Sequence, residues 1–254
     1  MALQATYVGH ATVHIALDGV RLLTDPVLRR RMGHLRRRGR VDAAALRGID
    51  TILISHAHYD HLDIPSLEKL GRVTPIVVPR GLAPLVRRRS FAHVVELDAG
   101  ERLAVGAVSV TATVAEHGGS RGVFASGPAL GYLVEGSSRV YFAGDTDLFP
   151  GMAELADGLD LALVPIWGWG PSLGRGKHMD PERAAEALKL LRPRVAVPIH
   201  WGTYHPFHLG LLEAPRYLRE PAERFVRAAA EKAPDVEVRL LQPGETLSLD
   251  DAPG

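Results

Sequence analysis

Residues 54–63 read ISHAHYDHLD and carry three histidines and two aspartates within ten positions. Residues 54 and 55 also end the segment 51–55, whose β-branched and aliphatic side chains predict a short buried strand. Crowded imidazoles and carboxylates are costly unless something compensates them, and a divalent cation does so directly. Four of the polar side chains can converge if the chain leaves the strand and curls: His56, His58, Asp60 and His61.

The spacing within this motif favours two ions rather than one. His56 and His58, two residues apart, suit one ion, whereas Asp60 and His61 point elsewhere and suit a second. The alternative is a solvated polar loop, and a His-X-His pair alone would favour that interpretation. The complete His-X-His-X-Asp-His string directly after a strand is far more specific, so metal binding is the better hypothesis.

The rest of the chain alternates between strand and helix patterns, which predicts an α/β protein. An Asp18-Gly19 turn joins the first two strands, and Asp180 caps a later helix. Strands are predicted over 12–17, 20–24, 51–55, 75–79, 108–114, 129–135, 139–144, 160–166, 194–200, 236–241 and 246–249, and helices over 63–71, 81–89, 180–193 and 220–233. Because no Pro/Gly/Ser-rich linker interrupts them, we expect one domain of packed sheets with outer helices over residues 1–254.

Composition excludes several classes of protein. There is no cysteine among the 254 residues, so disulfides, thiolate metal ligands and cysteine nucleophiles are ruled out. Thirty basic residues balance 29 acidic ones, which argues against a protein that coats nucleic acid or an anionic membrane. The first residues lack a signal-peptide pattern and no apolar run is long enough to span a bilayer, so we expect a cytoplasmic protein.

Several motifs resemble one known family. HAHYDH matches the His-X-His-X-Asp-His signature of the metallo-β-lactamase fold, and VAEHGGSR, FAGDTD, VPIHWGTYHP and GKHMDPERAAEAL continue the likeness. These segments look most similar to the branch that contains ascorbate-6-phosphate lactonase and the phospholipase D that hydrolyses N-acyl-phosphatidylethanolamine. The resemblance implies a four-layer αββα sandwich with a one- or two-metal site at the edge of its sheets.

The same resemblance implies a ligand set. His56, His58 and His117 would hold the first metal; Asp60, His61 and His200 would hold the second, and Asp145 would bridge the two. All seven ligands donate nitrogen or oxygen, so two divalent ions are expected, with zinc as the default and manganese or iron as alternatives. Asp60, Asp145 and His178 are the predicted catalytic residues.

The predicted activity is hydrolysis by water shared between the two metals. Two divalent cations carry four positive charges, which Asp60 and Asp145 only partly neutralise, so the site should prefer a small anionic ester, lactone or phosphodiester. Two alternatives stay open: a nuclease or cyclic-nucleotide phosphodiesterase, and a non-catalytic metal-binding scaffold or regulator. No stable nucleic-acid partner is expected, and a homo-oligomer is compatible with the sequence.

Further residues near these motifs have competing interpretations. His178 precedes the Asp180 helix and either contacts substrate or simply enters the helix; Trp167 and Trp169 lie in a glycine-rich loop predicted to cover the site and bind substrate. His205 is a candidate substrate contact. Four other residues have structural interpretations at least as good as functional ones: His10, His14, Asp25 and His208.

A basic run extends from residue 29 to residue 40 and reads RRRMGHLRRRGR. It contains seven of the arginines, which would bind phosphates, RNA or lipid headgroups if they acted together. No aromatic residue interleaves with them to stack on bases. A solvated loop is therefore the preferred interpretation of this segment.

Overall fold

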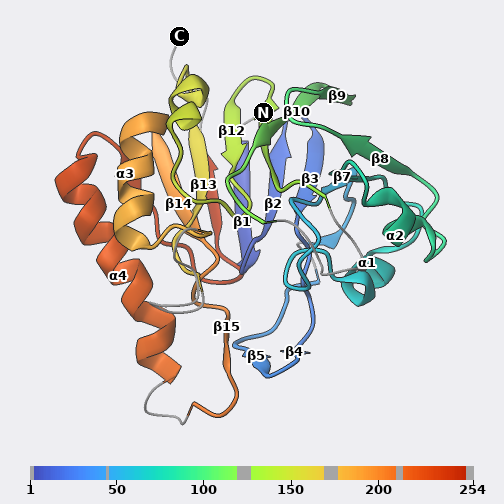
Figure 1. Cartoon of the computed structure of the whole chain (residues 1–254), viewed down its shortest axis with the longest axis horizontal. Helices are drawn as coiled ribbons and strands as arrows, with labels where there is room; N and C mark the ends of the chain where they lie inside the picture. Colours follow the sequence, from blue (N-terminus) through green and yellow to red (C-terminus); the bar gives the residue numbers. More distant parts are fainter. Residues whose placement is uncertain (1–2, 44–45, 119–126, 169–176, 210–213, 250–254) are drawn as a thin grey trace.

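Two seven-stranded sheets packed face to face form the centre of the protein. The computed structural model describes residues 3–43, 46–118, 127–168, 177–209 and 214–249. Figure 1 shows the two sheets side by side, with helices α1 and α2 outside one of them and α3 and α4 outside the other. The expected αββα sandwich is confirmed.

The first sheet combines an antiparallel amino-terminal half with a parallel half. Its strands run in the order β17 (Thr246–Leu249), β1 (Leu3–Gly9), β2 (Thr12–Leu17), β3 (Val20–Thr24), β6 (Thr51–Leu53), β7 (Ile76–Pro79) and β8 (Val94–Leu97). The β2–β3 hairpin is tight because Asp18 and Gly19 both adopt positive φ, at 51° and 81°, the combination that two-residue hairpin turns require.

The second sheet mirrors this plan. Its order is β16 (Glu237–Val238), β14 (Val195–Ile199), β13 (Leu161–Pro165), β12 (Arg139–Phe142), β11 (Leu130–Glu135), β10 (Val108–Val114) and β9 (Arg102–Val105). Strands β12, β13, β14 and β16 pair in parallel. Consecutive parallel strands bring their carboxyl ends to one edge, and this edge carries the candidate site.

Four helices close the outer faces of the sandwich. They are α1 (Ile64–Leu70), α2 (Ala83–Arg87), α3 (Pro181–Leu191) and α4 (Ala214–Lys232), together with a 3-10 helix, η3 (Pro150–Leu155). As predicted, Asp180 caps α3, since its carboxylate accepts a hydrogen bond of 2.8 Å from the backbone nitrogen of Arg183. No helix within the described part of the chain combines the length and the apolar character needed to cross a bilayer.

Three apolar clusters hold the layers together. The largest lies between the sheets and includes Tyr7, Tyr132 and Phe142. A second joins α3 and α4 to the outer face of the second sheet, and a third joins α1 and α2 to the first. The alternation of inward and outward side chains along β1 and β10 therefore follows from burial on one sheet face.

Several details differ from the sequence prediction. Strands β8 and β9 were not predicted. Helix α4 begins at Ala214 rather than at residue 220, and Pro221 lies inside it. The strand predicted over 236–241 shortens to β16. The basic run is an ordered hairpin, β4 (Arg31–Met32) and β5 (Leu35–Arg37), which pairs with β15 (Tyr204–Pro206) in a small third sheet.

Arg37 explains why the basic run is ordered. Its guanidinium is buried and donates hydrogen bonds to the carbonyl oxygens of Val8 and Val27, the latter at 2.9 Å. A buried guanidinium requires such acceptors, and the main-chain carbonyls of Val8 in β1 and of Val27 after β3 provide them. Arg37 therefore ties the third sheet to the sandwich. The segment is a hairpin rather than the predicted loop, but most of its other arginines are exposed to solvent, as predicted.

The packing of α4 can be tested with adjacent residues. Phe225 is fully buried in the cluster between α3 and α4, whereas Val226 is 37% exposed. Phe225→Ala should lower the free energy of unfolding by about 3–5 kcal/mol because it leaves a cavity. Val226→Ala should change it by less than about 0.5 kcal/mol. Urea denaturation measures both, and equal effects would contradict this placement of α4.

Candidate metal centre

Histidines and aspartates that are far apart in sequence meet at one edge of the sandwich. They lie in the loops that follow strands β6, β10, β12 and β14. Seven predicted ligands come together there: His56, His58, Asp60, His61, His117, Asp145 and His200. This edge is where the carboxyl ends of the parallel strands point, so the fold itself gathers the side chains.

Three histidines form one group, which we call the histidine triad: His56, His58 and His117. The Nε2 atom of His56 lies 2.9 Å from Nδ1 of His58, and Nε2 of His117 lies 3.2 Å from that same Nδ1. A tetrahedral ion with nitrogen ligands at 2.0–2.1 Å would separate them by about 3.3 Å. The triad therefore fits a single divalent ion with little rearrangement.

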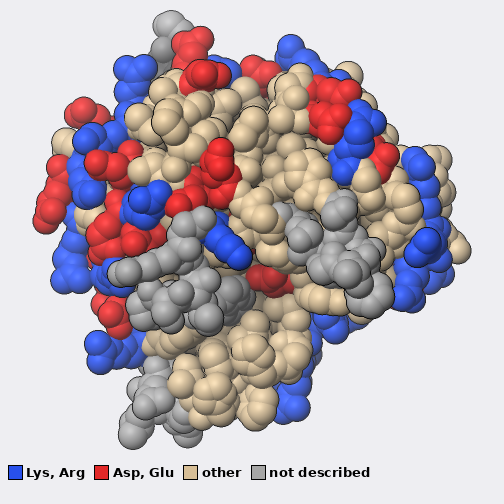
Figure 2. Space-filling model, in the orientation of Figure 1, with Lys and Arg blue, Asp and Glu red and all other residues tan. Residues whose placement is uncertain are grey.

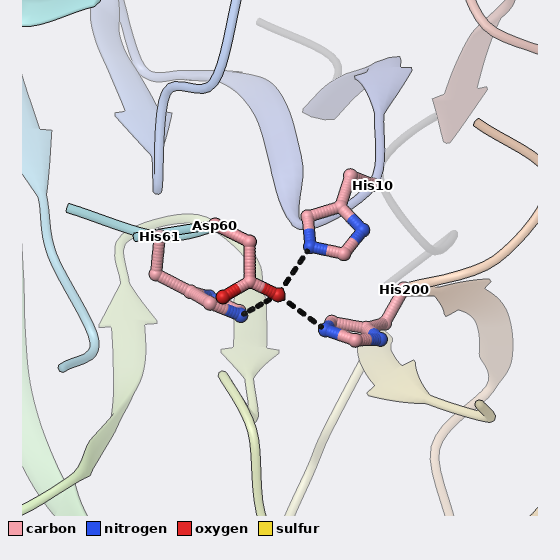
Figure 3. A group of neighbouring side chains, drawn as sticks. All are labelled: His10, Asp60, His61 and His200. Carbon is pink, nitrogen blue, oxygen red and sulfur yellow. Dashed lines mark hydrogen bonds and ion pairs between the residues drawn. The ribbon is translucent and has the colours of Figure 1, made fainter. Parts of the chain in front are cut away.

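A second group, the mixed triad, consists of Asp60, His61 and His200. Oδ2 of Asp60 lies 3.7 Å from Nε2 of His61 and 3.5 Å from Nε2 of His200. Figure 3 shows both imidazoles directed at this oxygen, with the imidazole of His10 approaching it from another side. Carboxylate and imidazole donors at such distances could hold a second ion.

Asp145 lies between the two triads. Its Oδ2 is 3.0 Å from Nε2 of His61, 3.4 Å from Nε2 of His200 and 3.8 Å from Nε2 of His56. The side chain is buried, and its other oxygen, Oδ1, has no hydrogen-bond partner among the described residues. A buried carboxylate oxygen without a partner is expensive, and a metal ion would satisfy it.

Main-chain carbonyls fix two of the imidazoles. Nδ1 of His200 lies 2.5 Å from the carbonyl oxygen of Trp167, and Nδ1 of His117 lies 2.6 Å from that of Lys177. Carbonyls only accept hydrogen bonds, so each Nδ1 carries the proton and each Nε2 offers its lone pair to the centre. Such outer contacts set ring orientation in metal sites.

Asp25 and Ser55 act on two further imidazoles. Oδ2 of Asp25 lies 2.6 Å from Nδ1 of His61, and Oγ of Ser55 lies 2.9 Å from Nδ1 of His56. The backbone nitrogen of Ser55 donates to Asp25 Oδ1 at 2.7 Å, so the buried carboxylate is itself held in place. The sequence left the role of Asp25 open, and the structure places it against His61.

The electrostatics of the cluster favour a bound positive charge. Burial lowers the pKa of His200, but the Asp145 carboxylate and hydrogen bonds to Asp145 and Asp60 raise it to about 9. Burial likewise opposes the charged form of His61, yet the Asp145, Asp60 and Asp25 carboxylates hold its pKa well above the usual value. Buried carboxylates that attract protons this strongly would also attract a cation.

Among the predicted substrate contacts that the structure describes, His178 is the one whose own side chain reaches the centre. Its Nδ1 lies 3.5 Å from Oδ2 of Asp145. Burial lowers the pKa of His178 to about 4, although the charge of Asp145 opposes this shift, so the imidazole is neutral near pH 7. A neutral imidazole can donate a hydrogen bond to a substrate oxygen through one nitrogen.

The other three predicted substrate contacts are Trp167, Trp169 and His205. Trp167 contributes its carbonyl to His200, and its ring packs edge-on against Tyr217 with centroids 5.7 Å apart. Trp169 lies outside the described residues. His205 sits on β15 opposite Arg36 and is not among the described residues that line the adjacent cavity.

His10 lies against the site although the sequence did not mark it as a site residue, and the same is true of Ser55. His10 was considered structural because it belongs to the first hairpin, yet its Nε2 lies 3.2 Å from Oδ2 of Asp60. Burial, with the neighbouring His200, lowers the pKa of His10 to about 3, although hydrogen bonding to Asp60 opposes the shift. The available signal was its position directly after a strand, which it shares with the predicted ligands.

A cavity of about 530 Å³ opens beside the mixed triad. Asp60 and His178 line the end of this cavity that is next to the candidate metal centre, and its remaining walls are largely apolar. They are contributed by Arg29, Met32, Gly33, His34, Leu35, Tyr59, Gly168, Pro206 and Tyr217. Figure 2 shows that the surface over β4, β5 and β15 is mostly uncharged, with basic residues at its rim. The cavity is therefore suited to a ligand with an apolar part.

Comparison with known proteins agrees with this geometry. Residues 20–201 match the family model for the β-lactamase superfamily domain. An N-acyl-phosphatidylethanolamine-hydrolysing phospholipase D of Caenorhabditis elegans is 31% identical over 97% of this chain and 76% of its own length. A metal-dependent hydrolase of Thermus thermophilus is 35% identical over 97% and 99% of the two chains. Igni18, a metallo hydrolase of Ignicoccus hospitalis, superposes with a TM-score of 0.73 at 26% identity over 98% and 99%.

Asp25 offers a test of the outer contacts. Asp25→Asn removes the charge that faces Nδ1 of His61 and should weaken zinc binding about 10- to 100-fold. Asp18→Asn, at the exposed β2–β3 turn of the same sheet, should leave zinc affinity unchanged. Competition with a chromogenic chelator measures both affinities. Wild-type affinity in Asp25→Asn would show that His61 needs no such support.

Proposed function

This chain belongs to the β-lactamase superfamily and is a metal-dependent hydrolase of the metallo-β-lactamase fold. From this premise we propose that it cleaves a small anionic ester, lactone or phosphodiester at a dinuclear centre. The observation that carries the proposal is the position of Asp145 between the histidine triad and the mixed triad.

In this proposal the histidine triad and the mixed triad would each hold one divalent ion, with Asp145 as a donor available to both. All the donors are nitrogen or oxygen, which suits zinc, with manganese and iron as alternatives. The ions supply Lewis acidity, which lowers the pKa of water toward about 7 and stabilises negative charge that develops on a substrate oxygen. The carboxylates of Asp60 and Asp145 leave the centre with a net positive charge, so an anionic group is attracted to it.

His178 orients the substrate in this proposal. The imidazole lines the cavity beside Asp145 and is neutral near pH 7, so it acts as a hydrogen-bond donor rather than as a protonated acid. A donor placed at the oxygen that gains charge stabilises the transition state more than the ground state. A hydrogen bond from His178 to that oxygen would favour hydrolysis over the alternative of a non-catalytic metal-binding scaffold.

The cavity narrows the choice of substrate. Met32, Leu35 and Pro206 offer apolar surface, and the guanidinium of Arg29 is already paired with Asp63 at 2.7 Å. The substrate therefore combines an anionic or ester group at the centre with an apolar body in the cavity. The relative named as a phospholipase D supports a phosphodiester among the three bond types.

A cyclic-nucleotide phosphodiesterase is the second candidate. The side chains of Tyr59 and Tyr217 line the cavity and offer aromatic surface on which a base could stack. Selective turnover of cyclic nucleotides would favour this candidate. A zinc-loaded protein inert toward esters, lactones and phosphodiesters would instead support a non-catalytic scaffold.

Asp145 provides the decisive variant for hydrolysis. The zinc-loaded wild type should hydrolyse at least one of bis(p-nitrophenyl) phosphate, an aryl ester and a lactone. Asp145→Ala should lower that rate by at least about 100-fold and weaken zinc retention, because both triads lose a shared donor. Asp147→Ala is the matched control, since Asp147 lies two residues away and pairs with Arg183 instead. Wild-type turnover in Asp145→Ala would refute the shared role.

His178 can be separated from the metal ligands by kinetics. His178→Ala should lower kcat by about 100-fold, whereas the zinc content stays that of the wild type. His178→Gln retains an amide donor and should recover part of the loss. His205→Ala, on β15 and away from the cavity lining, should keep wild-type kcat. Loss of zinc in His178→Ala would make His178 a ligand rather than a substrate contact.

A further inference from the structure

His10 connects the amino-terminal hairpin to the candidate metal centre. Its imidazole is buried in the turn between β1 and β2, and its ring centroid lies 4.0 Å from that of His200. Figure 3 shows its Nε2 facing the same oxygen of Asp60 that His61 and His200 face. With its proton on Nε2, His10 donates a hydrogen bond to this carboxylate, which only accepts hydrogen bonds.

The backbone at His10 indicates that its side chain is needed. The residue adopts a φ of 60°, in the left-handed region that disfavours a residue with a Cβ atom. Glycine or asparagine would adopt this conformation more easily. Strained backbone of this kind persists where the surrounding structure imposes it, and it concentrates at functional sites. The imidazole is the feature that a glycine or an asparagine could not supply.

Main-chain contacts hold His10 in place. Its nitrogen donates to Oγ1 of Thr203 at 2.7 Å, and its carbonyl oxygen accepts from the backbone nitrogen of His200 at 2.9 Å. The preceding Gly9 has no room for a side chain, because an added Cβ would lie 2.7 Å from the Arg37 guanidinium and 2.9 Å from Thr203 Oγ1. The turn is therefore fixed directly against the loop that carries His200.

We propose that His10 is a positioning residue of the metal centre, whose Nε2–H holds Oδ2 of Asp60 in the orientation that binds the ion of the mixed triad. In this role Nε2 of His10 keeps its proton and offers no lone pair to a metal, which distinguishes it from the fourth-ligand role that its position beside Asp60, His61 and His200 would also allow. The proposal rests on the proposed dinuclear centre and adds an eighth residue to it. It also explains why the β1–β2 turn must approach the loop after β14.

Two amide substitutions test this role. In His10→Gln the side-chain amide nitrogen can occupy the place of Nε2. In His10→Asn the side chain is too short for its amide nitrogen to reach Asp60. The Gln variant should keep the zinc affinity of both sites within about threefold of the wild type. The Asn variant should bind one of its two zinc ions about 10- to 100-fold more weakly. Competition of the full-length chain against a chromogenic chelator, with zinc alone as the ligand, gives both constants.

Which of the two variants binds zinc more tightly decides whether His10 positions Asp60 or only packs in the β1–β2 turn. A purely structural His10 predicts the opposite order, because asparagine suits the left-handed backbone better than glutamine. Wild-type zinc affinity in His10→Asn, or an equal loss in both variants, would overturn the proposal. His14→Ala, in the same hairpin, is the matched histidine control and should bind zinc normally. A wild type that binds no zinc would refute the proposed function as well, so the two failures are distinguishable.

A measurement on the wild type covers the case in which a variant does not fold. Nitrogen-15 NMR of histidine-labelled, zinc-loaded protein reports which imidazole nitrogens carry protons. His10 should show a protonated Nε2 with a hydrogen-bonded proton resonance. A deprotonated Nε2 with the chemical shift of a metal ligand would overturn the proposal.

Discussion

Buried imidazoles and carboxylates at one edge of the sandwich depend on a shared positive charge. Asp145 is the centre of this constraint, because its Oδ2 lies within 3.8 Å of an imidazole nitrogen of His56, His61 and His200. Without a bound cation, the buried Asp145 carboxylate would rely on protonated His61 and His200 for charge balance, and its Oδ1 would have no hydrogen-bond partner among the described residues. The loops, the outer hydrogen bonds and the adjacent cavity can all be understood as consequences of meeting that requirement.

The sandwich and the small third sheet contribute different groups to the site. The sandwich gathers the donors, because strands β6, β10, β12 and β14 end at the same edge. The small third sheet, anchored by buried Arg37, instead supplies walls of the cavity through Met32, Leu35 and Pro206. The donors and these cavity walls therefore lie on different elements, but the third sheet also contacts the donor loops, because the backbone nitrogen of Arg38 donates to the carbonyl oxygen of Thr203, three residues after His200.

The local sequence pattern predicted an α/β protein and a metal-binding cluster at His56, His58, Asp60 and His61, because imidazoles and carboxylates crowded at a strand end are costly without a cation. The four-layer sandwich and the more distant ligands His117, Asp145 and His200 came from the family resemblance; the sandwich is confirmed, and the ligand set stays a prediction. The sequence failed where the deciding contact is distant. Arg37 was assigned to a solvated loop, since nothing nearby in sequence reveals the carbonyls of Val8 and Val27 that accept its hydrogen bonds. His10 was considered structural for the same reason, because Asp60 is fifty residues away. Long-range partners of single polar residues leave no periodic pattern to read.

Anomalous diffraction from crystals of the zinc-loaded protein would locate the ions themselves. Two zinc peaks about 3.5–4 Å apart are expected, one within the histidine triad and one within the mixed triad, with Asp145 touching both. A single peak, or two peaks that leave Asp145 outside the coordination of either ion, would contradict this arrangement.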